Sequence, residues 1–142
     1  MKLTPYKAWD KVKKEITEVS SINFREECIK NKKYATKKFE DIELLPPTGV
    51  KDIKENESYL GDILKEPVHQ YSSKKDIEKR ENSFGIVKKY KNSNNLYLEW
   101  NFRRKYEGEC YWDSNELPIT HIDRYEIVGN IYTDPDMIKK ED

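Results

Sequence analysis

The fold of this chain is decided by its clearest strand pattern, which reads Leu96-Tyr97-Leu98-Glu99-Trp100-Asn101-Phe102. Successive side chains of a β-strand point to opposite faces, so the large apolar residues at every second position from Leu96 to Phe102 share one face. We predict that this face is core. A second strand pattern, Phe84–Tyr90, precedes it, and residues 91–95 between the two have the composition of a hairpin turn. An antiparallel pair is therefore expected.

A third strand pattern lies near the C-terminus and reads Tyr125-Glu126-Ile127-Val128-Gly129-Asn130-Ile131-Tyr132. Its internal Gly129 indicates a β-bulge or a close approach of another part of the backbone. After this strand, Asp134 can cap a helix N-terminus and Pro135 suits the first helical position. A short terminal helix is therefore predicted over Pro135–Lys140.

The first 45 residues fit neither the helical period nor the strand period cleanly. Turns rich in Lys and Asn favour short strands over a helix across Trp9–Val19. The strands predicted here are Ile22–Phe24, Glu27–Ile29 and Phe39–Leu45.

Residues 65–83 are rich in charge and contain few side chains able to enter a core. Within them, Ser72-Ser73-Lys74-Lys75-Asp76 has the pattern that starts a helix. We predict an exposed excursion from the sheet.

Length and composition favour a single domain over residues 1–142. A chain of 142 residues suits one core, and its 10 Tyr, 4 Phe and 3 Trp supply large side chains to bury although 38% of the residues are charged. No apolar run is long enough to span a membrane, and the charged start, Met1–Lys14, lacks the apolar stretch of a signal peptide. A cytoplasmic location without membrane association is expected.

Cys28 and Cys110 lie far apart, outside any CxxC spacing, so neither a disulfide framework nor a zinc ribbon is indicated.

The net charge is zero, with 27 basic and 27 acidic residues. A protein that binds nucleic acid without sequence preference usually carries an excess of basic residues, which displace counterions from the phosphates. Here only the N-terminal third is basic, since residues 1–40 hold 11 basic and 6 acidic side chains. A lysine-rich segment of this kind is either a solvated face or a phosphate-binding surface.

Three blocks of the chain resemble, in the same order, one known family. The first is Tyr6-Lys7-Ala8-Trp9-Asp10-Lys11. The second is Thr48–Asp52 followed by Glu57–Leu64, which in one ungapped register is similar to the family stretch TGLKDKNGKEIYEGDIV. The third is Tyr125–Ile138, which is similar to the family's closing stretch IEVIGNIYENPELL. On these blocks the chain resembles the YopX family, named for a prophage protein.

The resemblance implies a mainly-β fold around a small SH3-like barrel, here with hairpin extensions and the short C-terminal helix. It implies an origin in phages or prophages of bacteria and no established activity. No catalytic or binding residue carries over, because the matched motifs have the chemistry of turns and strands. One departure concerns the family's Asn-Gly, a strong signal for a type I′ hairpin turn, which is replaced here by Lys54-Glu55. The turn is therefore expected to be looser, or shifted toward Asn56.

The short glycine motifs of the second block are typical of turns. Thr48-Gly49 and Leu60-Gly61-Asp62 fit this role because glycine supplies a positive φ and aspartate accepts hydrogen bonds from turn amides. If Asp62 were a catalytic carboxylate, a partner acid or histidine would be expected at a spacing typical of a catalytic pair, and the sequence has none. There is also no P-loop, Rossmann or nucleophile-elbow pattern. We predict that the protein is not an enzyme and has no cofactor.

Metal binding is not favoured either. The two histidines, His69 and His121, lie in unrelated sequence contexts. A metal site formed by His121, Asp123 and Cys110 is conceivable, but structural or exposed roles are favoured for these residues. The expectation is that no metal is bound.

The most suggestive surface candidate is Phe102–Trp112, which interleaves cationic and aromatic residues. Arginine and aromatic side chains together can bind phosphate and stack on bases, or anchor a protein interface. The structural alternative is a hairpin that buries Tyr106, Tyr111 and Trp112 in the core. Trp9 has the same two interpretations, and a core position in the first strand is favoured. The candidate binding residues are Arg103, Arg104, Tyr106 and Trp112.

The leading functional hypothesis is a non-enzymatic accessory protein of a phage or prophage that acts stoichiometrically in the host cell. It would occupy a host protein or sequester a nucleotide-like molecule, and counter-defence against an immune signal is one concrete form. The alternative is a nucleic-acid-binding regulator that uses the lysine-rich N-terminal third, since small barrels often bind nucleic acid. The neutral net charge weighs against the alternative. Exposed strand edges also make a homo-oligomer an open expectation.

Overall fold

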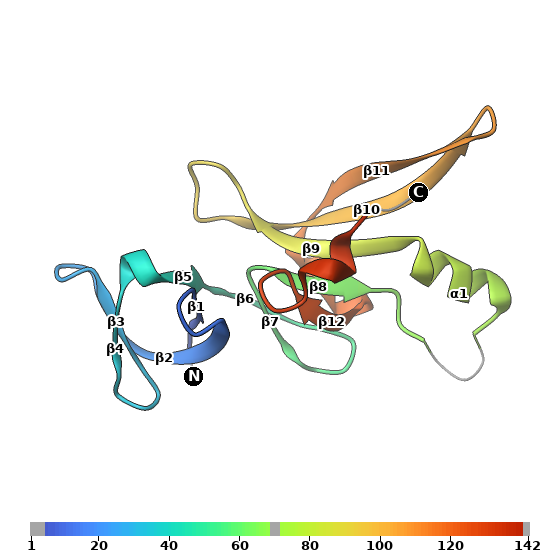
Figure 1. Cartoon of the computed structure of the whole chain (residues 1–142). Coiled ribbons are helices and arrows are strands. Elements are labelled where there is room, and N and C mark those ends of the chain that lie inside the picture. Colours follow the sequence, from blue (N-terminus) through green and yellow to red (C-terminus); the bar gives the residue numbers. More distant parts are fainter. Residues whose placement is uncertain (1–4, 69–71, 141–142) are drawn as a thin grey trace.

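The computed structural model describes residues 5–68 and 72–140, which form three antiparallel sheets (Figure 1). This confirms the mainly-β fold class. A five-stranded N-terminal sheet and a five-stranded C-terminal sheet lie side by side, with a two-stranded sheet between them (Figure 1). We call the two larger parts the N lobe (residues 5–45) and the C lobe (residues 60–140).

The N lobe has the strand order β4-β3-β2-β1-β5. Strands instead of a helix across Trp9–Val19 are thus confirmed, although their bounds differ from those predicted. The predicted strand Ile22–Phe24 overlaps the end of a nine-residue strand whose one buried residue is Val19, so most of that strand carries no apolar signal. The elements are β1 (Lys7–Asp10), β2 (Glu15–Asn23), β3 (Cys28–Asn31), β4 (Thr36–Lys38), the 3-10 helix η1 (Phe39–Asp41) and β5 (Ile42–Leu45).

The C lobe has the strand order β11-β10-β9-β8-β12. Its central strands are the hairpin predicted from residues 84–102, and their antiparallel pairing is confirmed. The register places Trp100 opposite Gly85 and Leu98 opposite Val87. The elements are β8 (Asp62–Lys65), the helix α1 (Lys74–Glu81), β9 (Ser83–Lys89), β10 (Leu96–Tyr106), β11 (Glu109–Leu117), the 3-10 helix η2 (Ile119–Arg124), β12 (Glu126–Asn130) and the 3-10 helix η3 (Pro135–Ile138).

Neither large sheet closes into a barrel within the described residues, because each has two end strands. The small SH3-like barrel expected from the resemblance is therefore not found. The physical reason is that the apolar strands are divided between two sheets, each of which buries its own residues. The N lobe packs around Ala8, Val19, Ile29 and Ile42.

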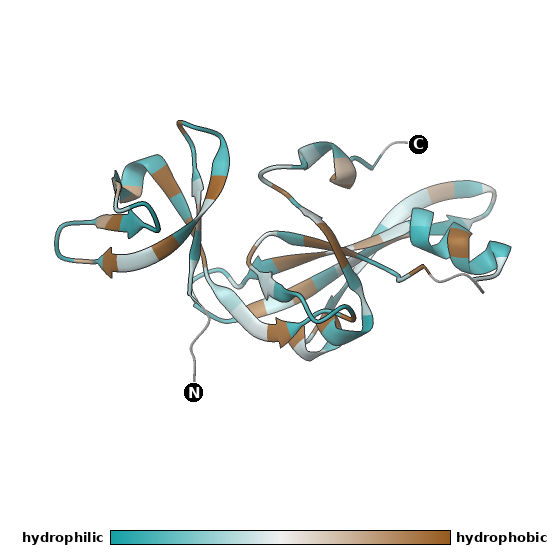
Figure 2. Cartoon of the chain, turned by 90° about the horizontal axis from the view of Figure 1, so that it is seen from below, coloured by the Kyte–Doolittle hydropathy of each residue, from teal (hydrophilic) through white to brown (hydrophobic). Residues whose placement is uncertain are grey.

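The C lobe buries side chains on both faces of its sheet. Leu64, Val87, Leu98, Trp100 and Ile122 form one cluster, with Leu96 and Phe102 packed against it. The face predicted from residues 96–102 is thus core, as expected. On the opposite face, Ile63, Phe84 and Ile86 form a second cluster. Figure 2 shows hydrophobic positions spaced along the strands, while α1 is largely hydrophilic.

The segment predicted to be an exposed excursion contains α1, no residue of which is buried. The Ser73 hydroxyl accepts a hydrogen bond from the Asp76 backbone N–H at 3.1 Å, and the Asp76 carboxylate accepts one from the Ser73 N–H. This capping box satisfies two amides that would otherwise be unpaired at the helix start. The predicted helix start is therefore confirmed, while part of the excursion, residues 69–71, lies outside the described residues.

The C-terminal segment combines a confirmed prediction with a corrected one. The register of β12 shifts between Ile127 and Gly129, which is the predicted bulge. The terminal helix is one short 3-10 segment instead of an α-helix over Pro135–Lys140. Asp134 does not cap it, because its carboxylate accepts a hydrogen bond from the Asn130 N–H at 3.2 Å.

The two-stranded sheet joins the lobes and consists of β6 (Pro47–Lys51) and β7 (Glu57–Tyr59). Inside the pair of Lys51 and Glu57, two backbone hydrogen bonds close the turn: the Asp52 N–H donates to the Asn56 carbonyl and the Glu55 N–H to the Asp52 carbonyl, each at 2.9 Å. Glu55 adopts a positive φ of 63°. Neither the looser turn nor the shift toward Asn56 that was expected from the loss of Asn-Gly is therefore found. Buried Asp52 organises this turn and accepts hydrogen bonds from the N–H groups of Lys54, Asn56 and Ile127.

Candidate functional site

The candidate residues from the sequence all lie on the hairpin of β10 and β11. Arg103 is paired with Trp112 and Arg104 with Tyr111 in a register that is continuous over the whole hairpin. Paired residues of an antiparallel sheet share a face, and neighbours along a strand alternate. Arg103 and Trp112 therefore project from one face, while Arg104 and Tyr106 project from the other. The four residues do not form one cluster.

The aromatic residues of this hairpin differ in burial. Trp112 is half-buried and its ring centroid lies 5.4 Å from that of Phe84, so it adds to the C-lobe core. Tyr106 and Tyr111 are 66% and 42% exposed. The interpretation that all three fill the core is thus wrong for the two tyrosines, because the end of the hairpin extends beyond the residues that could cover it (Figure 1).

Both arginines border one hollow beside α1, although the Arg103 guanidinium lies 6.0 Å from the Trp112 ring centroid, on the opposite face of β10. A cavity of about 480 Å³ lies between the end of this helix and β10, and we call it the α1–β10 cleft. It brings together the cationic side chains of Lys79 and Arg104 and two aromatic rings, while Tyr106 and Trp112 are not part of its lining. Its lining residues are Lys79, Asn82, Ser83, Trp100, Phe102, Arg103, Arg104 and Asn115.

The cations of the cleft are held loosely. The Lys79 ammonium lies 3.3 Å from a Glu66 carboxylate oxygen, and Nε of Arg104 lies 3.5 Å from Oδ2 of Asp113. Lys79 is 66% exposed and Arg104 is 56% exposed, and exposed ion pairs contribute little free energy. A multivalent anion can therefore compete for both cations.

The aromatic wall of the cleft is formed by β10. The Arg104 guanidinium lies 5.3 Å from the Phe102 ring centroid, in cation–π geometry. Trp100 is almost fully buried and stacks on Tyr125 at 4.2 Å, so it forms the floor. Half-buried Phe102 is the ring that a planar group could reach. Cations beside an aromatic face suit an anionic ligand that also carries a ring.

Sequence reasoning identified Arg103 and Arg104, in a candidate stretch that begins at Phe102, but missed the lining residues outside this stretch. Lys79, Asn82 and Ser83 lie in the segment that was expected to be an exposed excursion, and only the turn from α1 into β9 brings them to β10. The N–H of Arg103 donates to the Asn82 carbonyl at 3.0 Å, which fixes this approach. No local pattern in the sequence marks such a long-range contact.

The glycine motifs have the turn roles that were expected. Gly49 and Gly61 have φ values of 82° and 90°, and the Asp62 carboxylate accepts a hydrogen bond from the Tyr59 N–H at 2.8 Å. Asp62 also accepts one from Asn130 Nδ2 at 3.1 Å. Burial raises the pKa of Asp62 to about 6, although both of these hydrogen bonds and the charge of Lys7 oppose the rise.

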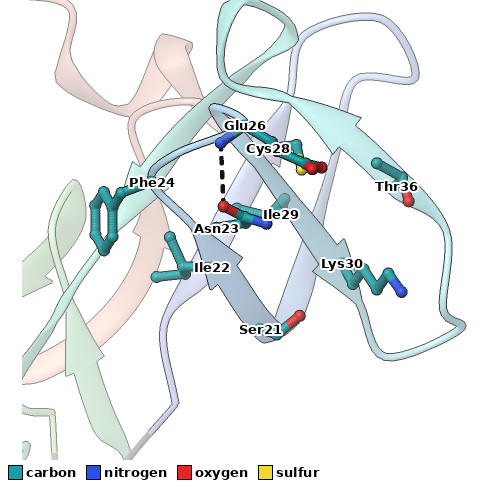
Figure 3. Close-up of a pocket in the computed structure, with 9 residues that line it drawn as sticks. All are labelled: Ser21, Ile22, Asn23, Phe24, Glu26, Cys28, Ile29, Lys30 and Thr36. Atoms are coloured by element: carbon teal, nitrogen blue, oxygen red, sulfur yellow. Dashed lines mark hydrogen bonds between the residues drawn. The ribbon is translucent and has the colours of Figure 1, made fainter.

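A second hollow lies in the N lobe and is shown in Figure 3. It has a volume of about 450 Å³ and lies along β2, β3 and the start of β4. One cation and one acid, Lys30 and Glu26, line it, and the Asn23 side-chain oxygen accepts a hydrogen bond from the Glu26 N–H at 3.0 Å (Figure 3). Because its charges are balanced and its aromatic residue, Phe24, stands apart from the others in this view, it matches no ligand class as well as the α1–β10 cleft does.

The remaining candidates are dispersed. Trp9 lies in β1 as expected, but that strand buries Ala8 and Asp10, and Trp9 stacks on Tyr132 of the C lobe with ring centroids 5.8 Å apart. His69 lies outside the described residues. Among residues 5–68 and 72–140, no group of three or more His, Cys, Asp or Glu side chains could hold a metal ion. Nor does any helix in the described part of the chain have the length and apolar character needed to cross a membrane.

Comparisons with known proteins agree with this architecture. The family described as YopX protein matches residues 5–139. Among solved structures, the crystal structure of protein EF1440 from Enterococcus faecalis is similar, with a TM-score of 0.53 and 18% sequence identity over 95% of this chain and 97% of that chain. At this identity the likeness concerns the fold alone. No curated protein matches the chain.

Proposed function

We propose that this chain, which belongs to the YopX protein family, is a non-enzymatic binding protein that holds an anionic, nucleotide-like ligand in the α1–β10 cleft. The single observation that supports this is the meeting of Lys79 and Arg104 with the Phe102 ring in one cavity of about 480 Å³. Phosphate oxygens would bind the cations, and a base would stack on the ring.

The biological setting of this proposal comes from the family. A phage or prophage protein that binds a nucleotide-like molecule stoichiometrically in the cytoplasm of its bacterial host lowers the free concentration of that molecule. If the molecule is an immune signal, the effect is counter-defence. Occupying a host protein is the other form of the same non-catalytic role.

A direct test is calorimetric titration of the full chain with ATP, a cyclic dinucleotide and inorganic phosphate. The expected result is that the nucleotides bind, that phosphate alone binds more weakly, and that each ligand is recovered unchanged. Lys79→Ala and Arg104→Ala should each weaken nucleotide binding about tenfold, because each removes one charge-assisted hydrogen bond. Lys75→Ala on α1 and Lys105→Ala on β10 are matched controls, since they remove one positive charge outside the cleft. Equal losses in all four variants, or no nucleotide binding, would refute the proposal.

A nucleic-acid-binding role has one observation in its favour. Lys13 from the β1–β2 turn and Lys32 and Lys33 from the β3–β4 turn line one groove of about 360 Å³ in the N lobe. Glu15 and Glu18 line the same groove, and Lys32 pairs with Glu18 at 3.4 Å, which weakens the attraction of the groove for phosphates. A gel-shift titration with random DNA and RNA at two salt concentrations separates the two functions. Steep salt dependence that is lost in Lys13→Glu would favour this role.

A further inference from the structure

The outer edge of β11 is unusual among the strand edges of this molecule. β11 has nine residues and lies at the end of its sheet, where its one described partner is β10. The other end strands of the two large sheets are shorter, with three residues in β4, four in β5 and five in β12, and β12 is interrupted by a bulge. Short strands and bulges are common means of preventing unwanted strand pairing.

Apart from its acidic side chains, β11 lacks the usual protective features. The sequence Glu109–Leu117 contains no lysine, arginine or proline. Its register with β10 runs without a shift from Tyr106 opposite Glu109 to Leu98 opposite Leu117. The result is a long, regular edge that could pair with another strand.

The hydrogen bonds identify which backbone groups face outward. The N–H of Arg103 donates to Asn82 on the β9 side, so the N–H groups of Phe102 and Arg104 point toward β11. The backbone N–H and C=O groups of their partners, Asp113 and Tyr111, therefore point toward β10, and those of Ser114 point away from it. In agreement, the Ser114 N–H donates to the Asp113 side chain, Oδ1, at 2.8 Å instead of to β10. The outward-facing positions are Cys110, Trp112, Ser114 and Glu116.

We propose that this edge accepts an extended, basic segment of a partner protein as an additional strand. Glu109, Asp113 and Glu116 are the charged residues of β11, and all are acidic. A carbonyl of the incoming strand would take the Ser114 N–H from Asp113. A lysine or arginine of that strand would then compete for this carboxylate with Arg104, whose exposed ion pair with Asp113 at 3.5 Å contributes little free energy. A second copy of β11 is the wrong occupant, because antiparallel self-pairing centred on Asp113 places this carboxylate against its copy.

The test uses the full chain, labelled with ¹⁵N, and two synthetic peptides of nine residues. One alternates lysine with valine and the other alternates glutamate with valine. We expect the lysine peptide to bind and to shift the amide resonances of the outward-facing positions of β11, with at least tenfold weaker binding of the glutamate peptide. Ser114→Pro removes an outward N–H without touching the pairing with β10, and it should abolish this binding. Ser114→Ala, which keeps the N–H, should bind like the unaltered chain.

Three results would overturn the proposal: no binding of the lysine peptide, equal binding of both peptides, or unchanged binding by Ser114→Pro. Self-association of the chain through β11 without peptide, detected by sedimentation, would also overturn it, because the occupant would then be a second copy. If Ser114→Pro does not fold, Asp113→Lys gives a second test. The Asp113→Lys variant should bind the glutamate peptide more tightly than the lysine peptide. If it still binds the lysine peptide more tightly, the proposal is contradicted.

Discussion

Asp62 of β8 and Asn130 of β12 are hydrogen bonded, with Asn130 Nδ2 donating to Asp62 Oδ1 over 3.1 Å. This contact joins the second and third of the three blocks that resemble the YopX family. Tyr132, two residues beyond Asn130, stacks on Trp9 of the first block. The Lys7 ammonium lies 4.2 Å from the Tyr59 ring centroid. The three blocks, far apart in sequence, thus meet where the N lobe contacts the C lobe.

The first prediction concerns the pH dependence of stability at this junction. Burial raises the pKa of Asp62 from 3.8 to about 6, so between these values the folded chain keeps a proton that the unfolded chain has lost. The contribution of Asp62 to stability is therefore greatest below about pH 4 and falls as the pH rises through 6, by on the order of 3 kcal/mol. Urea unfolding at pH 4.5 and pH 7.5 measures this. The free energy of unfolding of Asp62→Asn, relative to that of the unaltered chain, should be higher at pH 7.5 than at pH 4.5.

The control for this measurement is Asp123→Asn, which changes an exposed carboxylate. Its difference from the unaltered chain should be the same at both pH values. A difference for Asp62→Asn that does not change with pH would mean that the Asp62 carboxyl is not protonated in the folded chain at the lower pH.

The second prediction concerns the turn between β6 and β7. Glu55 has a φ of 63°, a left-handed conformation that costs a residue with a Cβ about 1 kcal/mol relative to glycine. Glu55→Gly should therefore raise the free energy of unfolding by about 0.5 to 1 kcal/mol. Asn56→Gly, at a position without a positive φ, should lower it, because glycine increases the entropy of the unfolded chain. Thermal unfolding of both variants is the measurement, and a loss of stability in Glu55→Gly would contradict the assigned turn.

Prediction from sequence succeeded where a signal is local and failed where a contact is distant. The alternation of residues 96–102, the bulge at Gly129 and the capping residues Ser73 and Asp76 each arise within a few neighbouring positions, and each was predicted. The division of the strands between two open sheets depends on pairings far apart in the chain, so the expected barrel was wrong. The site was predicted in part for the same reason: the arginines were recognisable, whereas Lys79 reaches the cleft only through tertiary structure.

The third prediction concerns Asp52, whose buried carboxylate accepts hydrogen bonds from three backbone N–H groups, two in its own turn and one from Ile127 of β12. Asp52→Ala leaves these three amides without their acceptor and should cost about 4.5 kcal/mol, since each such bond to a charged group is worth about 1.5 kcal/mol. Asp52→Asn keeps one acceptor oxygen and should cost less. Chemical denaturation gives both values. If the two variants lose equal stability, the packing of the side chain and not its hydrogen bonds would be responsible.

The fourth prediction tests the packing of Gly85 against Trp100 in the C-lobe core. A Cβ added at Gly85 would lie 2.7 Å from Trp100 Cε3 and 2.9 Å from Leu98 Cδ1, which is closer than carbon atoms can approach. Gly85→Ala should therefore cost about 1 to 3 kcal/mol through overpacking. Trp100→Phe removes the part of the indole that the new methyl group would meet, so Gly85→Ala should cost less in that background. A double-mutant cycle measures this coupling, which we expect to exceed 0.5 kcal/mol in magnitude. Strictly additive losses would show that the strain at Gly85 arises from Leu98 or the backbone and not from the Trp100 ring.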